Sequence, residues 1–244
     1  MSGISAAVRA AVRALKVGLR TSKAFSKEPW APAGLLSDGG EDESGMPRYA
    51  NVPPEAFPIL RSRQEGAHYA LWLDDPAANV DPPVVEVRPK SGLPETLRIV
   101  ARNAQEFLQV IETSGTRRQK SRSWTEKVGE RAALERARRV RYPTIDGLGV
   151  VCPPEAAAER PTLSELGGWT GPEWSRLFRG SVERWLKEGA PGLALAVARD
   201  LLITGRALQI DGFERSLAQV YHRLGRAPLA RVTLSTYDWH RRMA

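Results

Sequence analysis

Few side chains in this sequence are of the types that carry out covalent or metal chemistry. The histidines are His68, His222 and His240, which lie far apart, and Cys152 is the one cysteine. Zinc sites need several Cys or His ligands at short, defined spacings, and these four residues do not provide them. We therefore predict no metal site and no cofactor.

Catalysis by a nucleophile needs a reactive side chain beside a base. Cys152 stands in the apolar stretch 150–153, where a cysteine is usually buried and structural. The sequence contains no Gly-x-Ser-x-Gly elbow, no Gly-x-x-x-x-Gly-Lys phosphate loop and no Gly-x-Gly-x-x-Gly dinucleotide fingerprint. We predict a protein that is not an enzyme.

Basic side chains gather in residues 117–141, where ten arginines and lysines face three glutamates. Such a run can neutralise phosphates and give salt-dependent binding to nucleic acid, and Trp124 and Tyr142 at its edges can stack on bases. No zinc finger, helix-turn-helix signature or RNA-binding aromatic motif accompanies the run. We favour a solvated, charged helix that links two lobes, and keep phosphate binding as the alternative.

Two further kinds of residue point to binding. Exposed tryptophan and arginine are frequent anchors of protein interfaces, and Trp72 lies on a face of a predicted strand that we expect to be open. Asp74 and Asp75, with Asp81, can build a magnesium or calcium site, but Asp-Asp-Pro is also an ordinary turn, which we favour. The predicted partner-binding residues are Trp72, Asp74, Asp75, Arg117, Arg118, Arg122 and Trp124.

Length and composition limit the kinds of fold that can position these residues. A chain of 244 residues forms one large domain or two small ones. Its 42% hydrophobic and 26% charged residues are ordinary for a globular protein, and no apolar run approaches the roughly 20 residues of a membrane-spanning helix. One cysteine allows no internal disulfide, which favours the cytoplasm. The net charge of +8 favours an anionic partner, either nucleic acid, an acidic protein or a lipid surface.

Apolar patterning predicts an α+β fold: a small antiparallel sheet with flanking helices, followed by a helical lobe. We expect strands at 68–74 and 84–88 joined as a hairpin, and a third strand at 97–100. Asn103 is expected to cap a helix over 104–111. We divide the chain into an N-terminal helix and linker (1–47), a sheet-and-helix lobe (48–115), a basic helix and loop (116–168) and a helical lobe (169–244).

The helical lobe is predicted from four apolar stretches with helical spacing. The helix at 172–187 is expected to bury Trp174, Leu177, Phe178, Trp185 and Leu186. A strongly apolar helix follows at 193–203, and Asp211 is expected to cap the next one, which ends at Leu224. The last helix is expected at 229–243.

The N-terminal segment is basic and amphipathic. Residues 1–27 contain no acidic side chain, and Val8, Leu15 and neighbouring apolar residues fall at helical spacing. We favour a terminal helix that docks on the protein body. The alternatives are an organellar transit peptide or weak contact of residues 1–23 with a membrane surface.

One part of the chain resembles a known family. Phe57-Pro58-Ile59-Leu60, then Gly66-Ala67-His68-Tyr69-Ala70-Leu71-Trp72-Leu73-Asp74, Pro83-Val84-Val85 and Glu106-Phe107-Leu108 are similar to the core of the SMI1/KNR4-like superfamily, also called SUKH. The resemblance spans about residues 57–112 and lacks the family's usual opening helix and its glycine-rich turn. It implies an α+β domain without catalytic residues.

The resemblance also implies a function. Bacterial members of the superfamily are typically immunity proteins that bind and neutralise a cognate toxin of a polymorphic toxin system, often a nuclease. We therefore predict a protein-binding protein whose partner is such a toxin or effector. The alternative is an accessory protein that binds nucleic acid through residues 117–141.

Overall fold

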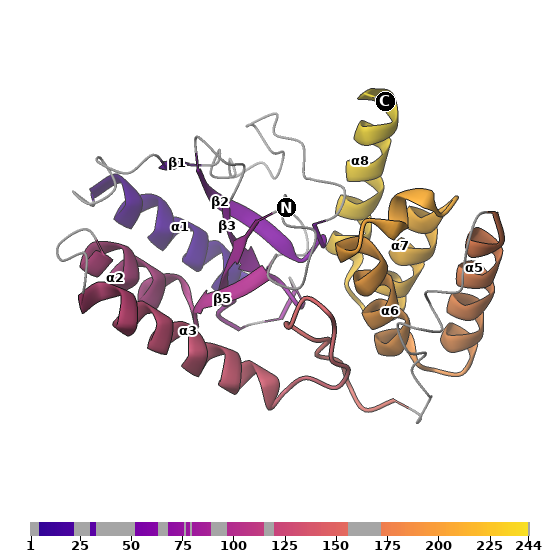
Figure 1. Ribbon diagram of the computed structural model, residues 1–244, viewed down its shortest axis with the longest axis horizontal. Helices are drawn as coiled ribbons and strands as arrows, with labels where there is room; N and C mark the ends of the chain where they lie inside the picture. The colour runs from indigo at the N-terminus through magenta and orange to yellow at the C-terminus, as the bar shows by residue number, and fades with distance from the viewer. Residues whose placement is uncertain are drawn as a thin grey trace. The chain divides into compact units, whose positions relative to one another are not determined.

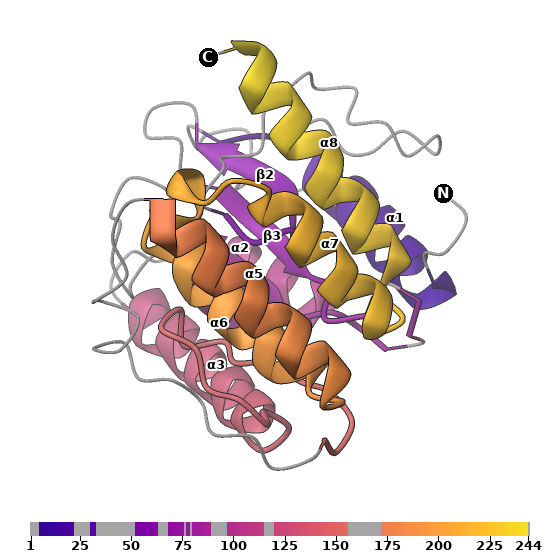
Figure 2. The ribbon, with the colours of Figure 1, turned by 90° about the vertical axis from the view of Figure 1, so that its right-hand side faces the viewer.

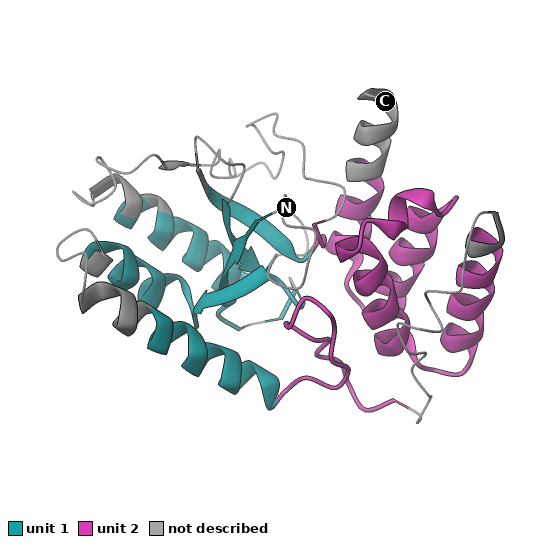
Figure 3. Cartoon of the chain, in the orientation of Figure 1, with its two compact units in different colours: residues 1–46, 55–91, 95–138 teal, residues 47–54, 92–94, 139–244 magenta. Residues whose placement is uncertain are grey.

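The computed structural model of the chain describes residues 5–21, 30–32, 52–62, 68–75, 77–78, 80–88, 97–114, 120–155 and 172–243. The chain divides into two compact units, coloured separately in Figure 3. Unit 1 comprises residues 1–46, 55–91 and 95–138, and unit 2 comprises residues 47–54, 92–94 and 139–244. Strands and helices in unit 1 and helices in unit 2 confirm the predicted α+β fold.

Unit 1 is built on an antiparallel sheet whose strands follow one another in chain order (Figure 1). Leu71 pairs with Val84, which pairs with Ala101, so their side chains form a row across three strands on one face. The predicted hairpin and the third strand are confirmed. The strands are β1 (Trp30–Pro32), β2 (Ala56–Ser62), β3 (His68–Trp72), β4 (Val84–Val87) and β5 (Leu97–Ala101).

Helices α1 (Ala6–Thr21) and α2 (Ala104–Ser114) lie side by side in unit 1, with α3 (Lys120–Ala137) beyond α2 (Figure 1). A single hydrophobic core joins the row on the sheet to Val8 and Leu15 of α1 and to Phe107 of α2. The apolar stripe of α1 is therefore buried, which confirms the prediction that this helix docks on the protein body.

Local sequence explains how α2 begins. The side-chain Oδ1 of Asn103 accepts a hydrogen bond from the backbone N–H of Glu106 at 2.9 Å, so Asn103 caps the helix as predicted. Strand β2 was not among the predicted strands. It contains Pro58, which cannot donate to a ladder, and its register against β3 shifts between Pro58 and Leu60.

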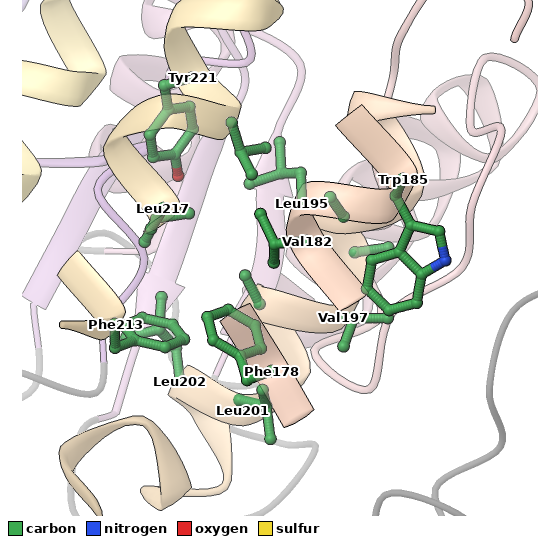
Figure 4. Packing of buried hydrophobic residues seen from close by; sticks show 14 of the residues in the cluster. Phe178, Val182, Trp185, Leu195, Val197, Leu201, Leu202, Phe213, Leu217 and Tyr221 are labelled. Carbon is green, nitrogen blue, oxygen red and sulfur yellow. The ribbon is translucent and has the colours of Figure 1, made fainter. Parts of the chain in front are cut away.

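In its described residues unit 2 is helical, and the four longer helices found there lie side by side (Figure 2). Their shared core is apolar (Figure 4), and within it the rings of Phe178 and Phe213 stack with centroids 5.1 Å apart. The predicted C-terminal helical lobe is confirmed. Its elements are α5 (Pro172–Lys187), α6 (Pro191–Ile203), the 3-10 helix η3 (Arg206–Gln209), α7 (Phe213–Arg223) and α8 (Ala227–Met243).

Two predictions about this lobe are wrong. Gly212, with a φ of 71°, occupies the N-cap position of α7 without any side-chain cap, so Asp211 does not cap the helix. Leu177 is 40% exposed and is not part of the buried face of α5. Trp185 is buried as expected, whereas the side chain of Trp174 lies outside the described residues.

A buried ion pair holds the loop that contains Asp146 against α6. Arg199 interrupts the apolar sequence of α6, and both it and Asp146 have side chains only 1% exposed. Arg199 Nε donates to Asp146 Oδ2 at 3.1 Å, and Arg199 Nη1 donates to the carbonyl oxygen of Gly149 at 2.7 Å. A single antiparallel bridge between Tyr142 and Val150 closes the loop that carries these acceptors.

None of the helices in the described part of the chain combines the length and the apolar character that crossing a lipid bilayer requires.

Candidate functional site: the exposed face of α3

Helix α3 carries most of the described residues of the basic run, and one of its faces is packed. Val128, Gly129, Ala132 and Arg136 are buried. A Cβ added to Gly129 would lie 2.7 Å from the carbonyl oxygen of Ile99, so the α3 backbone runs close to strand β5. The expectation of a fully solvated linking helix is therefore wrong for this face.

The opposite face of α3 is exposed and carries charges of both signs around one leucine. Leu134 is 66% exposed, and it is one helical turn from both Glu130 and Arg138. Leu134 is therefore an exposed apolar side chain with charges of both signs around it. We call this set the α3 surface, and its members are Lys127, Glu130, Arg131, Leu134, Glu135 and Arg138.

Glu106, in the first turn of α2, connects this surface to the rest of unit 1. Its Oε1 accepts hydrogen bonds from Arg131 Nη2 at 2.8 Å and from Arg102 Nη2 at 3.0 Å, and its Oε2 accepts one from the Arg102 backbone at 2.7 Å. Arg102 Nη1 also reaches Glu135 at 3.4 Å. The network therefore ties two successive turns of α3 to the start of α2.

Electrostatics favour the ionised form of Glu106. Burial alone would raise the pKa of its carboxyl, but the hydrogen bonds from Arg102 and Arg131 outweigh that effect and hold the pKa below its ordinary value. The same pairing raises the pKa of Arg102. The side chains of Arg102 and Arg131 are 41% and 55% exposed, so each pair alone contributes little to stability.

A second, more buried ion pair anchors the C-terminal half of α3. Asp74 Oδ1 accepts from Arg136 Nη2 at 2.7 Å, its Oδ2 accepts from Arg136 Nη1, and the two side chains are 17% and 7% exposed. Trp72 Nε1 donates to Asp74 Oδ1 at 3.2 Å, and the Arg136 guanidinium lies 5.7 Å from the centre of the indole ring. Asp74 thus fixes the end of β3 to α3.

These contacts place the predicted partner-binding residues. Trp72 is only 1% exposed, so the expectation that it lies on an open face is wrong. Asp74 is held by Arg136, and Asp75 Oδ1 accepts from the backbone N–H of Ala77 at 2.9 Å, as the favoured turn requires. Arg117 and Arg118 lie outside the described residues, and so do the side chains of Arg122 and Trp124, whose backbone belongs to α3.

Within the described ranges, the structure bears on two of the chemistries considered in the sequence, metal binding and attack by the Cys152 thiol. No group of three or more His, Cys, Asp or Glu side chains in the described ranges is arranged to hold a metal ion. Burial of the Cys152 thiol, with the Glu155 carboxylate nearby, raises its pKa to about 11. The thiol is therefore protonated at neutral pH, the form that is not nucleophilic.

Glu155 itself has a structural role in unit 2. Its carboxylate accepts hydrogen bonds from the backbone N–H groups of Gly192 at 2.5 Å and Leu193 at 3.3 Å, at the start of α6. A carboxylate at a helix N-terminus is favourable because it satisfies donors that the helix leaves open. Arg141 Nη2 holds the loop by donating to the carbonyl oxygen of Glu155 at 2.8 Å.

The sequence reasoning missed Glu106 and Leu134. The spacing of Arg102 and Glu106 is that of an ion pair across one helical turn, but Arg131 is 25 residues further on and only the fold brings it close. Comparison with protein-family models and with curated proteins finds no match to this chain, so the family resemblance stays a prediction.

Proposed function

We propose that this chain is a non-catalytic binding protein that recognises another protein. The α3 surface carries the proposal: it combines charges of both signs with an exposed leucine, and ion pairs brace the helix that presents it. A rigid surface loses little conformational entropy on binding, so more of the contact energy appears as affinity.

The proposed biological role is that of an immunity protein. In this role the chain binds a toxin of a bacterial polymorphic toxin system in the cytoplasm and blocks it. The support is the resemblance of residues 57–112 to the SMI1/KNR4-like superfamily, together with the net charge of +8, which suits an acidic face on the toxin.

Phosphate binding through residues 117–141 has weaker support. Two arginines of this run, Arg131 and Arg136, make ion pairs with carboxylates of unit 1. Each such pair lowers the positive charge that the run can offer to phosphates, and with it the number of counterions that binding would release.

The test is binding to the product of the adjacent reading frame, measured by calorimetry, and rescue of growth when that product is expressed. We expect a complex and protection with the natural sequence. Leu134→Glu should weaken the complex at least about tenfold, a loss of roughly 1.4 kcal/mol. Ala133→Glu is the matched control, because Ala133 is exposed on the same helix but points about 100° away from Leu134.

Three results would contradict the proposal. The first is no binding and no protection, and the second is equal weakening by Leu134→Glu and Ala133→Glu. The third is binding of a DNA duplex at physiological salt, with an affinity that falls steeply as salt rises and that disappears in Arg138→Glu. This result would establish the nucleic-acid alternative.

A further inference from the structure

The exposed side of helix α7 consists of basic and amide side chains alone. In this helix, all of which the structure describes, the exposed positions fall within about 100° of the circumference and over roughly 12 Å of the axis. We call this set the α7 face, and its members are Arg215, Gln219, His222 and Arg223. The face contains neither an apolar nor an acidic residue.

The helix that presents this face is firmly held. Phe213 and Tyr221, on its opposite side, are 0% exposed, and the ring of Phe213 stacks on that of Phe178. After the helix, Gly225 has a φ of 73°, and the backbone N–H of Arg226 donates to the carbonyl oxygen of Tyr221 at 2.8 Å. These contacts close the last turn, so a ligand need not order the backbone when it binds.

The charge around the α7 face has a single sign. From residue 212 to residue 235 the sequence contains four arginines and one acidic residue, Glu214, which is 3% exposed and interacts within the chain. Arg226 is 5% exposed, with its Nη2 donating to the carbonyl oxygen of Val151, and Arg231 also interacts within the chain. These two arginines add to the positive field without being available as contacts.

Arg215 and Arg223 are available. Neither side chain makes an ion pair or a hydrogen bond with another described residue, although Asp211 lies one turn before Arg215. Arg223 suits the dipole at the end of α7, but Arg215 is the third residue of the helix, where the dipole disfavours a cation. The fold therefore gains nothing from the charge of Arg215, and an anionic ligand would.

The composition of the α7 face favours nucleic acid over protein as the source of that anion. The centre of a protein interface is apolar and rich in aromatic residues, and no exposed residue of α7 is of either kind. Interfaces with nucleic acid are more polar and more positively charged. Arginine and glutamine side chains are among the usual donors to phosphate oxygens.

Two other occupants fit this face less well. A helix on a membrane surface inserts its apolar side, but the apolar residues of α7 lie in the core of unit 2. A second copy of the chain, placed symmetrically on the same face, would bring two surfaces of like charge together.

Geometry limits the contact to the backbone of the nucleic acid. A recognition helix projects into the major groove, whereas α7 packs against α5, α6 and α8 and leaves only a narrow face open. Arg215 and Arg223 are separated by roughly 12 Å along the axis, so they can contact two different phosphates.

We infer that the α7 face binds the sugar-phosphate backbone of a nucleic acid without reading its base sequence. Arg215 and Arg223 each neutralise one phosphate, and Gln219 and His222 donate hydrogen bonds between them. The site belongs to unit 2, and its ligand is of a different class from the protein partner proposed for the α3 surface.

The first test needs no ligand. Arg215→Gln should fold and unfold at an equal or higher midpoint of thermal unfolding, because it removes a cation from the first turn of a helix. Arg223→Gln should lower the midpoint slightly, because a cation in the last turn is favourable. A clearly lower midpoint for Arg215→Gln would reveal a structural role for this arginine and overturn the inference.

The second test measures binding of a short fluorescent DNA duplex by anisotropy, at salt concentrations from about 50 to 200 mM. We expect the natural chain to bind two duplexes of unrelated sequence equally. Arg215→Gln and Arg223→Gln should each weaken binding about tenfold at 50 mM salt and reduce the slope of log K against log salt by about 0.9, the effect of losing one phosphate contact.

Lys187→Gln and Arg138→Gln are the matched controls. Each removes one positive charge from an exposed position on another helix, so the net charge falls equally while the α7 face stays intact. Both should bind DNA with the slope of the natural chain. Equal losses in these controls would mean that only the net charge attracts DNA, and would overturn the inference.

The remaining outcomes separate this inference from the proposed function. Absence of DNA binding at 50 mM salt, or loss of binding in Arg138→Gln while Arg215→Gln still binds, would overturn the α7 site. Tighter binding of a polyglutamate peptide that is lost in Arg215→Gln would replace the nucleic acid by an acidic protein. None of these measurements uses Leu134 or the adjacent reading frame, so failure of one proposal leaves the other standing.

Discussion

Asp146 joins several partners in the polar interior of unit 2. Its Oδ2 accepts from Arg199, and its Oδ1 accepts from Thr144 Oγ1 at 2.5 Å and from the Leu148 backbone N–H at 2.9 Å. Removing one partner of a buried ion pair leaves the other charge in a medium that cannot solvate it. The cost of that loss is large because Arg199 has no route to water from a position only 1% exposed.

We expect Asp146→Ala to lower the free energy of unfolding by about 3–5 kcal/mol. Urea unfolding followed by circular dichroism measures the change. Asp211→Ala is the control: that carboxylate is exposed, and the expected change is within about 0.5 kcal/mol. A loss of less than about 1 kcal/mol in Asp146→Ala would show that the pair is not desolvated as its burial indicates.

The Cys152 thiol gives a prediction that depends on pH. Only the thiolate reacts with iodoacetamide, and burial raises the thiol pKa to about 11. Alkylation of the folded protein should therefore be slow at neutral pH and should accelerate as the pH rises toward 11. In urea the thiol returns to an ordinary pKa of about 8.5 and should react faster at every pH below that value. Equal rates with and without urea at neutral pH would contradict the shift.

Single residues also show what sequence can and cannot reveal. Asn103 was predictable as a cap because the hydrogen bond it makes is local. The Asp-Asp-Pro turn was predictable for the same reason. The ion pair between Asp74 and Arg136, which are 62 residues apart, could not be predicted, because any of the many arginines could have been the partner of Asp74. Trp72 was misjudged because alternation in a strand does not say whether a second face is covered.

At the scale of the element, α3 shows why a packed helix can look solvated in sequence. Among the side chains of α3 that the structure describes, the buried positions are Val128, Gly129, Ala132 and Arg136, and these form no stripe of large apolar side chains. Close approach of its backbone to β5, together with the Asp74–Arg136 pair, takes the place of such a stripe. In contrast, α1 and α7 place large apolar residues at helical spacing, and their packing was predictable.

We expect Gly129→Ala to destabilise the protein by about 1–3 kcal/mol, the usual cost of overpacking. The added methyl group would need to displace the backbone of β5, which cannot move as a side-chain tip can. Hydrogen exchange should show faster exchange in α3 and β5. The same substitution at Gly180 of α5, where an added Cβ would meet no described atom within 4 Å, should have the opposite sign, so the pair controls for helix propensity. A more stable Gly129→Ala would mean that α3 does not lie close to β5.

At the scale of the whole molecule, the net charge of +8 does not act as one basic surface. Two arginines of residues 117–141, Arg131 and Arg136, make ion pairs within unit 1, and Arg199 is buried within unit 2. Composition therefore gives the net charge but not how many charges remain available at a given surface. Long-range attraction to anions depends on the net charge, whereas specific binding depends on the exposed groups.

Binding to membranes separates these two effects. A helix binds a membrane surface through its apolar face, but Val8, Ala11 and Leu15 of α1 are at most 5% exposed. We expect the full chain not to sediment with neutral phosphatidylcholine vesicles. With vesicles containing phosphatidylserine it should sediment at low salt through its net charge, and release should follow at about 0.15 M salt, where screening is strong. Salt-resistant sedimentation with neutral vesicles would mean that α1 leaves the core of unit 1 to insert, contrary to its packing.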